Sequence, residues 1–346
     1  MTAPSASTDL VALDVGGAAI KAADGMGGAW AVPFAMWREW RRLPEAIADL
    51  VGPLRPRRLV ATMTGEIADC YPSRAAGVAA IVAALEEAAR MAGSRDPVGI
   101  YLLDGRIVAA AEAVALPRAA AASNWHALAR LAASLAGGRA GVLVDVGSTT
   151  TDIVPLADAG PEPLATDDAG RMRSGELVYT GIERTPLATL ARSLPHGGIR
   201  RPLASERFAE SRDVWLVLGE LPEDDSPCDT ADGGPATRTA ARVRIARSML
   251  VEPDAFSAAD AVAAARQWAA AQARLVARAL RRVAAASGRV PETVVLSGHG
   301  TALARQAIAL TAWNVSCESL ADRLGPAVSR VAPAHALAAI ARRELR

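Results

Sequence analysis

Cysteine is scarce in this chain of 346 residues, and its three cysteines, Cys70, Cys228 and Cys317, lie far apart. An odd, scattered set does not form a disulfide framework and is typical of a reducing compartment. No CxxC or HExxH sequence is present, which argues against a structural zinc site. Hydrophobic residues make up 51% of the chain, so sizeable cores can form without either kind of cross-link.

Long apolar runs and excess charge are also lacking. No run reaches the ~20 apolar residues that a membrane-spanning helix needs. Residues 1–9 do not combine a basic segment with an apolar stretch, so no secretory signal is expected. The formal net charge of +1 gives no electrostatic reason to bind nucleic acid or a membrane surface. We therefore expect a cytoplasmic protein that binds neither.

Lysine is almost absent, because Lys21 is the only lysine among the 38 lysines and arginines. Most surface positions tolerate either cation, but a compact ammonium on a flexible stem differs from a planar guanidinium at a binding site. Chance is one explanation of this single lysine. The other is that Lys21 contacts a group that a guanidinium does not fit.

An internal repeat is the clearest positive feature of the sequence. Residues 11–21 and residues 143–154 each read as a strand, a Gly-rich turn and a returning strand. The two copies align residue for residue: Asp14 with Asp145, Gly16 with Gly147, and Lys21 with Asp152. A repeat that opens each half of the chain indicates a duplicated domain.

Around the repeat, strands alternate with helices. Strands are expected at 58–64, 98–104, 293–297 and 313–316, and helices at 75–91, 258–287 and 334–344. This pattern favours an α/β fold with largely parallel sheets covered by helices. The segment 221–235, rich in acids, glycine and proline, reads as a loop. We expect one domain of residues 1–137 with 331–346 and a second of residues 138–330.

The turns of the two hairpins are candidate phosphate cradles, because successive backbone N–H groups among small residues bind anions. The candidate phosphate-binding residues are Gly16, Gly17, Lys21, Gly147, Ser148, Thr149 and Thr150. Carboxylates next to a phosphate repel it unless a cation intervenes, so Asp14 and Asp145 are expected to hold a hydrated Mg²⁺. A pair of ordinary tight hairpins is the alternative interpretation.

Further candidates lie at strand ends and in short polar segments, where ligands bind in open α/β sheets. Glu66 follows a buried strand, and the candidate catalytic set is Asp14, Lys21, Glu66, Asp145 and Asp152. The candidate substrate contacts are Asp104, Arg106, Asn124, Trp125, His126, Glu176, Tyr179, Gly298 and Gly300. Each has a structural alternative as a turn, cap or core residue, and His299 in its turn is most often structural.

Three segments resemble the phosphate-1, phosphate-2 and adenosine motifs of the actin/hexokinase/Hsp70 superfamily: residues 14–21, 145–152 and 296–300. More narrowly, the chain resembles the hydantoinase/oxoprolinase-like proteins of tetrahydromethanopterin-linked one-carbon transfer. The motifs that carry this second resemblance are residues 63–66, 103–106, 122–126, 174–181, 183–186 and 228–233. The resemblance implies two RNase H-like domains of the actin-like ATPase type with the site in the cleft between them.

Archaeal members of this group include the condensing enzyme of methanofuran biosynthesis, which joins an aminomethyl-furan diphosphate to the phenol of a tyramine unit and releases diphosphate. The resemblance therefore implies a transferase that uses Mg²⁺ and a phosphorylated small molecule. Two other classes stay open: an ATP-dependent small-molecule kinase or oxoprolinase-like hydrolase, and a nucleotide-binding regulator without turnover. The oligomeric state is also open, with a homodimer as one option.

Overall fold

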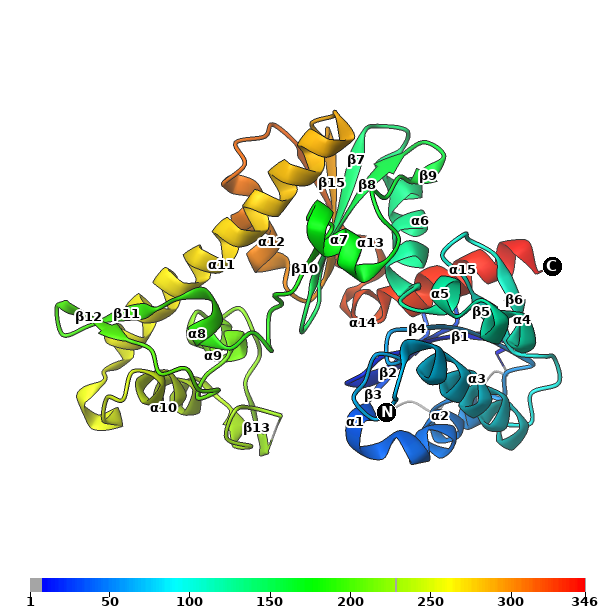
Figure 1. Cartoon of the computed structure of the whole chain (residues 1–346), viewed down its shortest axis with the longest axis horizontal. Coiled ribbons are helices and arrows are strands. Elements are labelled where there is room, and N and C mark those ends of the chain that lie inside the picture. The colour runs from blue at the N-terminus through cyan, green and yellow to red at the C-terminus, as the bar shows by residue number, and fades with distance from the viewer. Residues whose placement is uncertain (1–7, 228, 346) are drawn as a thin grey trace.

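The computed structural model describes residues 8–227 and 229–345. Two sheet-containing bodies lie side by side, and a third lobe lies at the far end of the long helix α11 (Ala258–Ser287) (Figure 1). Residues 1–7, which carry most of the expectation about a secretory signal, and Cys228 lie outside the described residues. Within the described part, no helix has both the length and the apolarity to cross a bilayer.

The first sheet has the strand order β3-β2-β1-β4-β5-β6. Its strands are β1 (Leu10–Val15), β2 (Ala19–Ala23), β3 (Ala29–Pro33), β4 (Arg58–Met63), β5 (Gly99–Tyr101) and β6 (Ile107–Ala109). β1 is buried along its whole length, as expected of an apolar run covered on both faces. Helices α2 (Leu43–Val51) and α3 (Arg74–Met91) share a core with one face, and α15 (Ala332–Glu344) packs on the other.

The second sheet has the order β10-β8-β7-β15-β16. Its strands are β7 (Gly141–Val146), β8 (Thr151–Ala157), β10 (Leu177–Val178), β15 (Thr293–Gly298) and β16 (Ser316–Ser319), with β9 (Gly160–Pro161) paired to β8. Alternate residues of β7 face opposite sides. Val142 and Val144 join the core formed with α11 and α12 (Thr301–Ala309), while Leu143 joins the core formed with α6 (Asn124–Ala136).

The two sheets are built on one plan, in which an antiparallel hairpin pairs with a parallel strand. Asp14 lies opposite Lys21 in the first hairpin, and Asp145 lies opposite Asp152 in the second. β1 pairs in parallel with β4, as β7 does with β15. The predicted α/β fold with duplicated RNase H-like sheets, and the residue-for-residue alignment of the repeat, are therefore confirmed.

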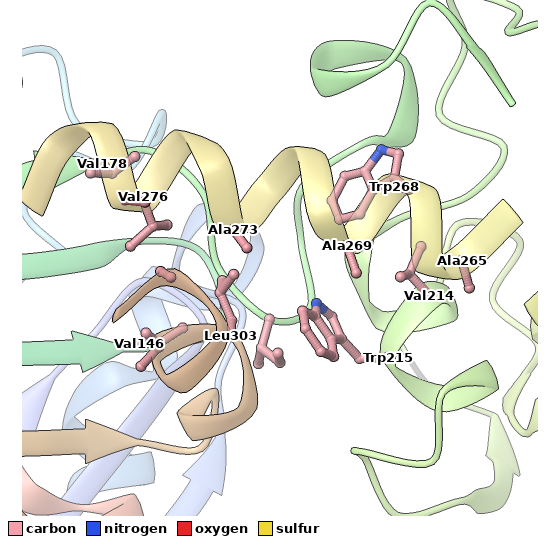
Figure 2. Packing of buried hydrophobic residues seen from close by; sticks show 14 of the residues in the cluster. Val146, Val178, Val214, Trp215, Ala265, Trp268, Ala269, Ala273, Val276 and Leu303 are labelled. Atoms are coloured by element: carbon pink, nitrogen blue, oxygen red, sulfur yellow. The ribbon is translucent and has the colours of Figure 1, made fainter. Parts of the chain in front are cut away.

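The third lobe is built by residues between β10 and α11. Its elements are α8 (Leu187–Leu190), β11 (Ser193–His196), β12 (Ile199–Pro202), α9 (Ser211–Val217), β13 (Asp224–Pro227), β14 (Pro235–Ala236) and α10 (Arg238–Ser248). In Figure 2, Trp268 of α11 lies toward the same end of the helix as Trp215 and Val214 of α9, while Val276 and Val146 of the second sheet lie toward the other end. One continuous apolar cluster along α11 thus joins the lobe to the sheet.

Short helices complete the described chain. They are α1 (Met36–Glu39), α4 (Ala110–Ala115), α5 (Pro117–Ala120), α7 (Asp168–Ser174), α13 (Leu320–Leu324) and α14 (Pro326–Arg330), with 3-10 turns at Trp40–Arg42, Gly52–Leu54 and Pro253–Ala255. The helix expected at 258–287 is confirmed as α11. The strand expected at 98–104 is shorter, because a turn with Gly105 at φ +89° reverses the chain after β5.

Two other expectations need correction. The strand expected at 313–316 is wrong, because the strand that pairs with β15 is β16 and starts at Ser316. The segment 221–235 is not a plain loop, because it contains the β13–β14 pair. The predicted domain boundaries stay a prediction. Helix α6 contributes to the cores of both bodies: Trp125 packs in the cluster that contains Leu143 of the second sheet, and Ala127 packs in the cluster that contains α15 and β1.

Candidate functional site

A cleft of about 800 Å³ lies between the two hairpins. Both hairpin turns line it, and we call them the first hairpin loop (residues 16–19) and the second hairpin loop (residues 147–150). The sequence-predicted residues that line the cleft are Asp14, Gly16, Gly17, Lys21, Glu66, Asn124, Trp125, Asp145, Gly147, Ser148, Thr149, Thr150, Asp152, Tyr179 and Gly298. The structure therefore brings most of the sequence-predicted residues together around one cleft.

The two hairpin loops close in the same way. The amide of Gly16 donates to the carbonyl of Ala19 at 3.0 Å, and that of Gly147 to the carbonyl of Thr150 at 2.9 Å. Within the described residues, the amides of Gly17, Ala18, Ser148 and Thr149 donate to no oxygen atom. Each loop therefore presents free backbone donors to the cleft, which is the arrangement that binds anions.

Asp14 and Lys21 form the charged pair of the first hairpin. Lys21 Nζ lies 3.7 Å from Asp14 Oδ2, and the carboxyl side chain is 3% exposed. Burial raises the pKa of Asp14, and the Lys21 ammonium and the Asn124 amide partly oppose this rise. Among the described residues, Asp14 Oδ1 has no hydrogen-bond partner. One oxygen of this buried carboxyl thus remains available to a ligand.

Asp145 lies opposite Asp152 in the second hairpin. Burial, reinforced by the charge of Asp152, raises the pKa of Asp145 to about 6. The nearby Ser297 hydroxyl and the charge of Lys21 act on the pKa of Asp145 in the opposite direction. The charge of Lys21 therefore acts on one carboxyl of each hairpin, Asp14 and Asp145.

Asp152 is not a free acid, because Arg171 of α7 pairs with it at 2.9 Å. Burial raises the pKa of Asp152 and Arg171 opposes the rise. The Arg171 guanidinium is buried and also stacks on the Trp125 ring, 3.9 Å from its centroid. Arg171 therefore covers this face of Trp125, which is one of the candidate substrate contacts.

Glu66 has the titration behaviour expected of a general base near neutral pH. Its side chain is 1% exposed, and burial raises its pKa to about 7. Arg74 of α3 lies 3.8 Å from Oε1 and opposes the rise, while the charge of Asp168 adds to it. Arg74 also pairs with Asp168 of α7 at 2.6 Å, so an ion pair joins the two bodies beside Glu66.

Five predicted substrate contacts do not line the cleft: Asp104, Arg106, His126, Glu176 and Gly300. Asp104 and Arg106 pair with each other at 2.8 Å in the exposed turn between β5 and β6. His126 shares a hydrogen bond with the Tyr101 hydroxyl at 2.8 Å, and burial lowers its pKa to about 4. These groups serve the local structure instead of the site.

Glu176 and Gly300 are also explained by packing. The Glu176 carboxylate is buried and accepts hydrogen bonds from the amides of Leu164 and Ala165 and from Ser174. A Cβ on Gly300 would lie 2.3 Å from Val146 Cγ1, so glycine is needed for this turn to pack against the Val146 side chain. Burial beneath an irregular segment is not readable from residue type, which is why the sequence grouped these residues with the site.

Two acids of the segment 221–235 are also paired. Asp232 lies 3.0 Å from Arg244, and Asp229 lies 3.6 Å from Arg184. Conversely, the sequence did not identify Arg171, which lines the cleft. Glu183 and His299 also line the cleft, and only the folded chain brings these two side chains together.

The fold and the site define a two-sheet α/β protein in which duplicated hairpin loops present free amides, one lysine and buried carboxyls to a shared cleft. The chain matches the hydantoinase/oxoprolinase family over residues 57–344 and belongs to that family.

Two curated relatives carry the same printed name, (4-{4-[2-(gamma-L-glutamylamino)ethyl]phenoxymethyl}furan-2-yl)methanamine synthase. The protein of Methanocaldococcus jannaschii is 34% identical over 228 residues, a match that spans 65% of this chain and 66% of the relative. The protein of Methanococcus vannielii is 31% identical over 206 residues, which spans 59% of this chain and 91% of the relative.

Similar solved structures are more distant in sequence. The activator of 2-hydroxyisocaproyl-CoA dehydratase from Clostridium difficile has a TM-score of 0.43 and 12% identity, covering 97% of this chain and 96% of that one. Component A of (R)-2-hydroxyglutaryl-CoA dehydratase from Acidaminococcus fermentans has a TM-score of 0.42 and 13% identity, covering 96% and 97%.

Proposed function

We propose that this protein is a cytoplasmic transferase of methanofuran-type cofactor synthesis, serving tetrahydromethanopterin-linked one-carbon metabolism in a methylotroph. It condenses an aminomethyl-furan diphosphate with the phenol of a tyramine-derived acceptor and releases diphosphate. The printed name of the two relatives supports the proposal, because it describes a furan joined to a phenyl ring through an ether. The observation that carries it is the pair of hairpin loops whose free amides face one cleft together with Lys21.

The bond changes balance without a further reactant. The bond between the methylene carbon and the diphosphate oxygen breaks, and its electron pair leaves with the diphosphate. The phenol oxygen forms the new bond to the methylene carbon, and its proton passes to a carboxylate. Because charge develops on the leaving group as the bond breaks, donors that are fixed around the diphosphate lower the barrier.

The described residues include groups that can bind the leaving diphosphate and a group that can accept the phenolic proton. The free amides of the two hairpin loops and the Lys21 ammonium hold and stabilise the diphosphate. Glu66 is the residue best placed to accept the phenolic proton, because its buried carboxyl lines the cleft and its pKa lies at about 7. Exposed apolar side chains at the cleft, Ile67, Met172 and Tyr179, offer surface to the two rings of the substrates.

Two carboxyls of the cleft fit a hydrated Mg²⁺. Among the described residues, no group of three or more His, Cys, Asp or Glu side chains is placed to hold a metal. Mg²⁺ needs fewer protein ligands, because it binds through one or two carboxylates together with phosphate oxygens and water. Asp14, with one unpartnered buried oxygen, and Asp145 would hold it. When bound, the ion would neutralise part of the diphosphate charge.

The direct test incubates the purified protein with the aminomethyl-furan diphosphate, a tyramine-derived phenol and Mg²⁺, and measures both the ether product and diphosphate. The proposal expects the two products in equal amounts and only when both substrates are present. A parallel reaction with ATP distinguishes the other class of enzyme. Formation of ADP without ether would overturn the condensation and favour an ATP-dependent kinase or hydrolase.

Asp14→Asn is expected to raise the Mg²⁺ concentration needed for half-maximal turnover and to lower kcat by well over tenfold. The amide keeps the size of the carboxyl but removes the charge that would attract the cation. The fold should be unaffected, because burial of Asp14 disfavours its charged form. A Mg²⁺ titration of the rate checks the first effect and a melting curve the second. Unchanged Mg²⁺ dependence would show that Asp14 is not a ligand.

A further inference from the structure

The turn that follows the inner strand of each sheet has the same construction in both halves. β4 and β15 pair in parallel with the equivalent strands β1 and β7. The amide of Gly65 donates to the carbonyl of Val15 at 3.0 Å, and that of Gly300 to the carbonyl of Val146 at 3.1 Å. His299 therefore occupies the place beside the second hairpin loop that Thr64 occupies beside the first.

His299 belongs to a chain of charged contacts. Its Nε2 lies 3.0 Å from Glu183 Oε1 and 3.5 Å from the Ser148 hydroxyl of the second hairpin loop. Arg212 Nη2 donates to the other oxygen of Glu183 at 2.5 Å. Although burial alone would raise it, the hydrogen bond from His299 and the charge of Arg212 hold the pKa of Glu183 at about 2. Glu183 is therefore a fixed anion on one side of the imidazole ring.

The segment that carries Glu183 is fastened to the second hairpin loop by its backbone. The amides of Glu183 and Arg184 both donate to the carbonyl of Ser148 at 3.0 Å, and that of Ile182 donates to Gly147. A Cβ on Gly181 would lie 2.5 Å from the Gly147 carbonyl, so only glycine permits this approach. Glu183, and through it His299, is thereby held in register with the loop amides.

The second hairpin also needs a cation from elsewhere in the chain. At the position where the first hairpin has Lys21, the second has Asp152, and this acid is already paired with Arg171. The loop amides and hydroxyls are neutral donors, which bind an anion less strongly than charged donors do. Besides the Mg²⁺ that Asp14 and Asp145 would hold, a ligand with two phosphoryl groups would thus meet the Lys21 ammonium at the first hairpin but no unpaired side-chain cation of the second hairpin.

We propose that His299 supplies this missing cation and binds the phosphoryl group at the second hairpin loop, with Glu183 as its positioning residue. His299 lines the cleft, and its Nδ1 has no hydrogen-bond partner among the described residues. In the doubly protonated ring, Nε2–H donates to Glu183 and Nδ1–H is left for a phosphate oxygen. This inference rests on the proposed function and extends it: Lys21 and His299 bind opposite ends of one diphosphate.

The test measures the Kd of inorganic diphosphate by titration calorimetry in the presence of Mg²⁺. His299→Gln is expected to raise this Kd at least tenfold, because glutamine can keep the contact with Glu183 but has no Nδ1 donor. His299→Asn, whose amide lies near the Nδ1 position, is expected to lose less. The matched control is His196→Gln, whose ring contacts the Ala255 carbonyl outside the cleft and whose Kd should not change.

Glu183→Gln separates positioning from general damage to the fold. Since Glu183 acts through His299, this change is expected to raise the Kd several-fold in the wild type and to have no added effect in the His299→Gln variant. Melting curves without ligand identify any variant that fails to fold. A Kd for His299→Gln within twofold of the wild type would overturn the inference, as would a wild type that does not bind diphosphate.

Two further measurements extend the test. One compares diphosphate with ADP as the ligand of His299, and the other separates the failure of this inference from the failure of the proposed function. A loss of ADP affinity by the same factor in His299→Gln would support the contact and point to a nucleotide as its ligand. Diphosphate binding that depends on His299, in a protein that forms no ether, would overturn the proposed function alone. Ether formation that is equally fast in His299→Gln and in the wild type would overturn the role of His299 alone.

Discussion

Replacing Lys21 by arginine is expected to lower kcat by about 100-fold, a loss of about 2.7 kcal/mol of transition-state stabilisation. Lys21 Nζ lies 3.7 Å from Asp14 Oδ2 and also lowers the pKa of Asp145. A compact ammonium can serve both carboxyls and a diphosphate within this Gly-lined turn, whereas a longer planar guanidinium cannot be placed in the same way. Lys21→Ala should be at least as harmful. The measurement is kcat with saturating substrates and Mg²⁺.

Neither change at Lys21 should lower the melting temperature much without ligand. The Lys21 side chain is 34% exposed, and ion pairs that are open to solvent contribute little to stability. The matched control is the reverse exchange at the cleft edge, Arg330→Lys, which should keep kcat within about twofold. Near-wild-type turnover of Lys21→Arg would refute the interpretation of this single lysine, because a cation of any shape would then suffice.

The repeated hairpins could be predicted from the sequence because their structure is local. Strand alternation and the glycines of each turn are set by neighbouring residues. The sequence alignment of Asp14 with Asp145 therefore matches the structure, in which each of these residues occupies the equivalent position in its hairpin. The long helix α11 was also predictable, since an apolar stripe over thirty residues leaves few alternatives.

The charge pattern of the cleft could not be predicted, because it depends on contacts between distant segments. Arg171 neutralises Asp152, and Glu183 reaches His299 across 116 residues of sequence. Arginines are numerous in this chain, so residue type alone did not show which of them would be buried beside the site. The sequence therefore did not show that Asp152, a candidate catalytic residue, is paired with Arg171 before any ligand binds.

The same contacts show how the two bodies are joined around the cleft. Arg74 and Asp168 form an ion pair between α3 and α7, and Arg171 of α7 stacks on Trp125 of α6. Both contacts lie beside cleft residues, so closure of the cleft and the environment of Glu66 are coupled. A carboxyl whose pKa depends on burial is therefore sensitive to how tightly the bodies close.

Replacing Glu66 by glutamine is expected to lower kcat at least 100-fold at pH 8. Glutamine matches the shape of glutamate and can keep the contact with Arg74, which lies 3.8 Å away, but it cannot take a proton from the phenol. Because burial raises the pKa of Glu66 to about 7, only the ionised form above this pH acts as the base. In the wild type, kcat/KM should rise with pH through about 7 and then level off. The residual kcat/KM of Glu66→Gln should not show this rise, which we call the limb of the pH profile.

A second variant tests whether the limb belongs to Glu66. The charge of Asp168 raises the pKa of Glu66, and Asp168 also engages Arg74 at 2.6 Å. Asp168→Asn removes the repelling charge and weakens the competition for Arg74, so the limb should move to lower pH. A limb that stays in place in Asp168→Asn, or that persists in Glu66→Gln, would assign the titration to another group.

Ionisation of Glu66 is also expected to lower the stability of the fold, although the same ionised form is the one that supports activity. Its folded pKa of about 7 lies above the ordinary value of 4.5, so the folded state holds the proton more tightly than the unfolded state. The cost of ionising this buried carboxyl is absent below pH 4.5, grows as the pH rises, and is complete above about pH 7. Glu66→Gln removes that cost, so at pH 8 the inactive variant should melt at a temperature equal to or above that of the wild type. A variant that is both inactive and clearly less stable at pH 8 would mean that Glu66 supports the fold, and that its loss of activity says nothing about proton transfer.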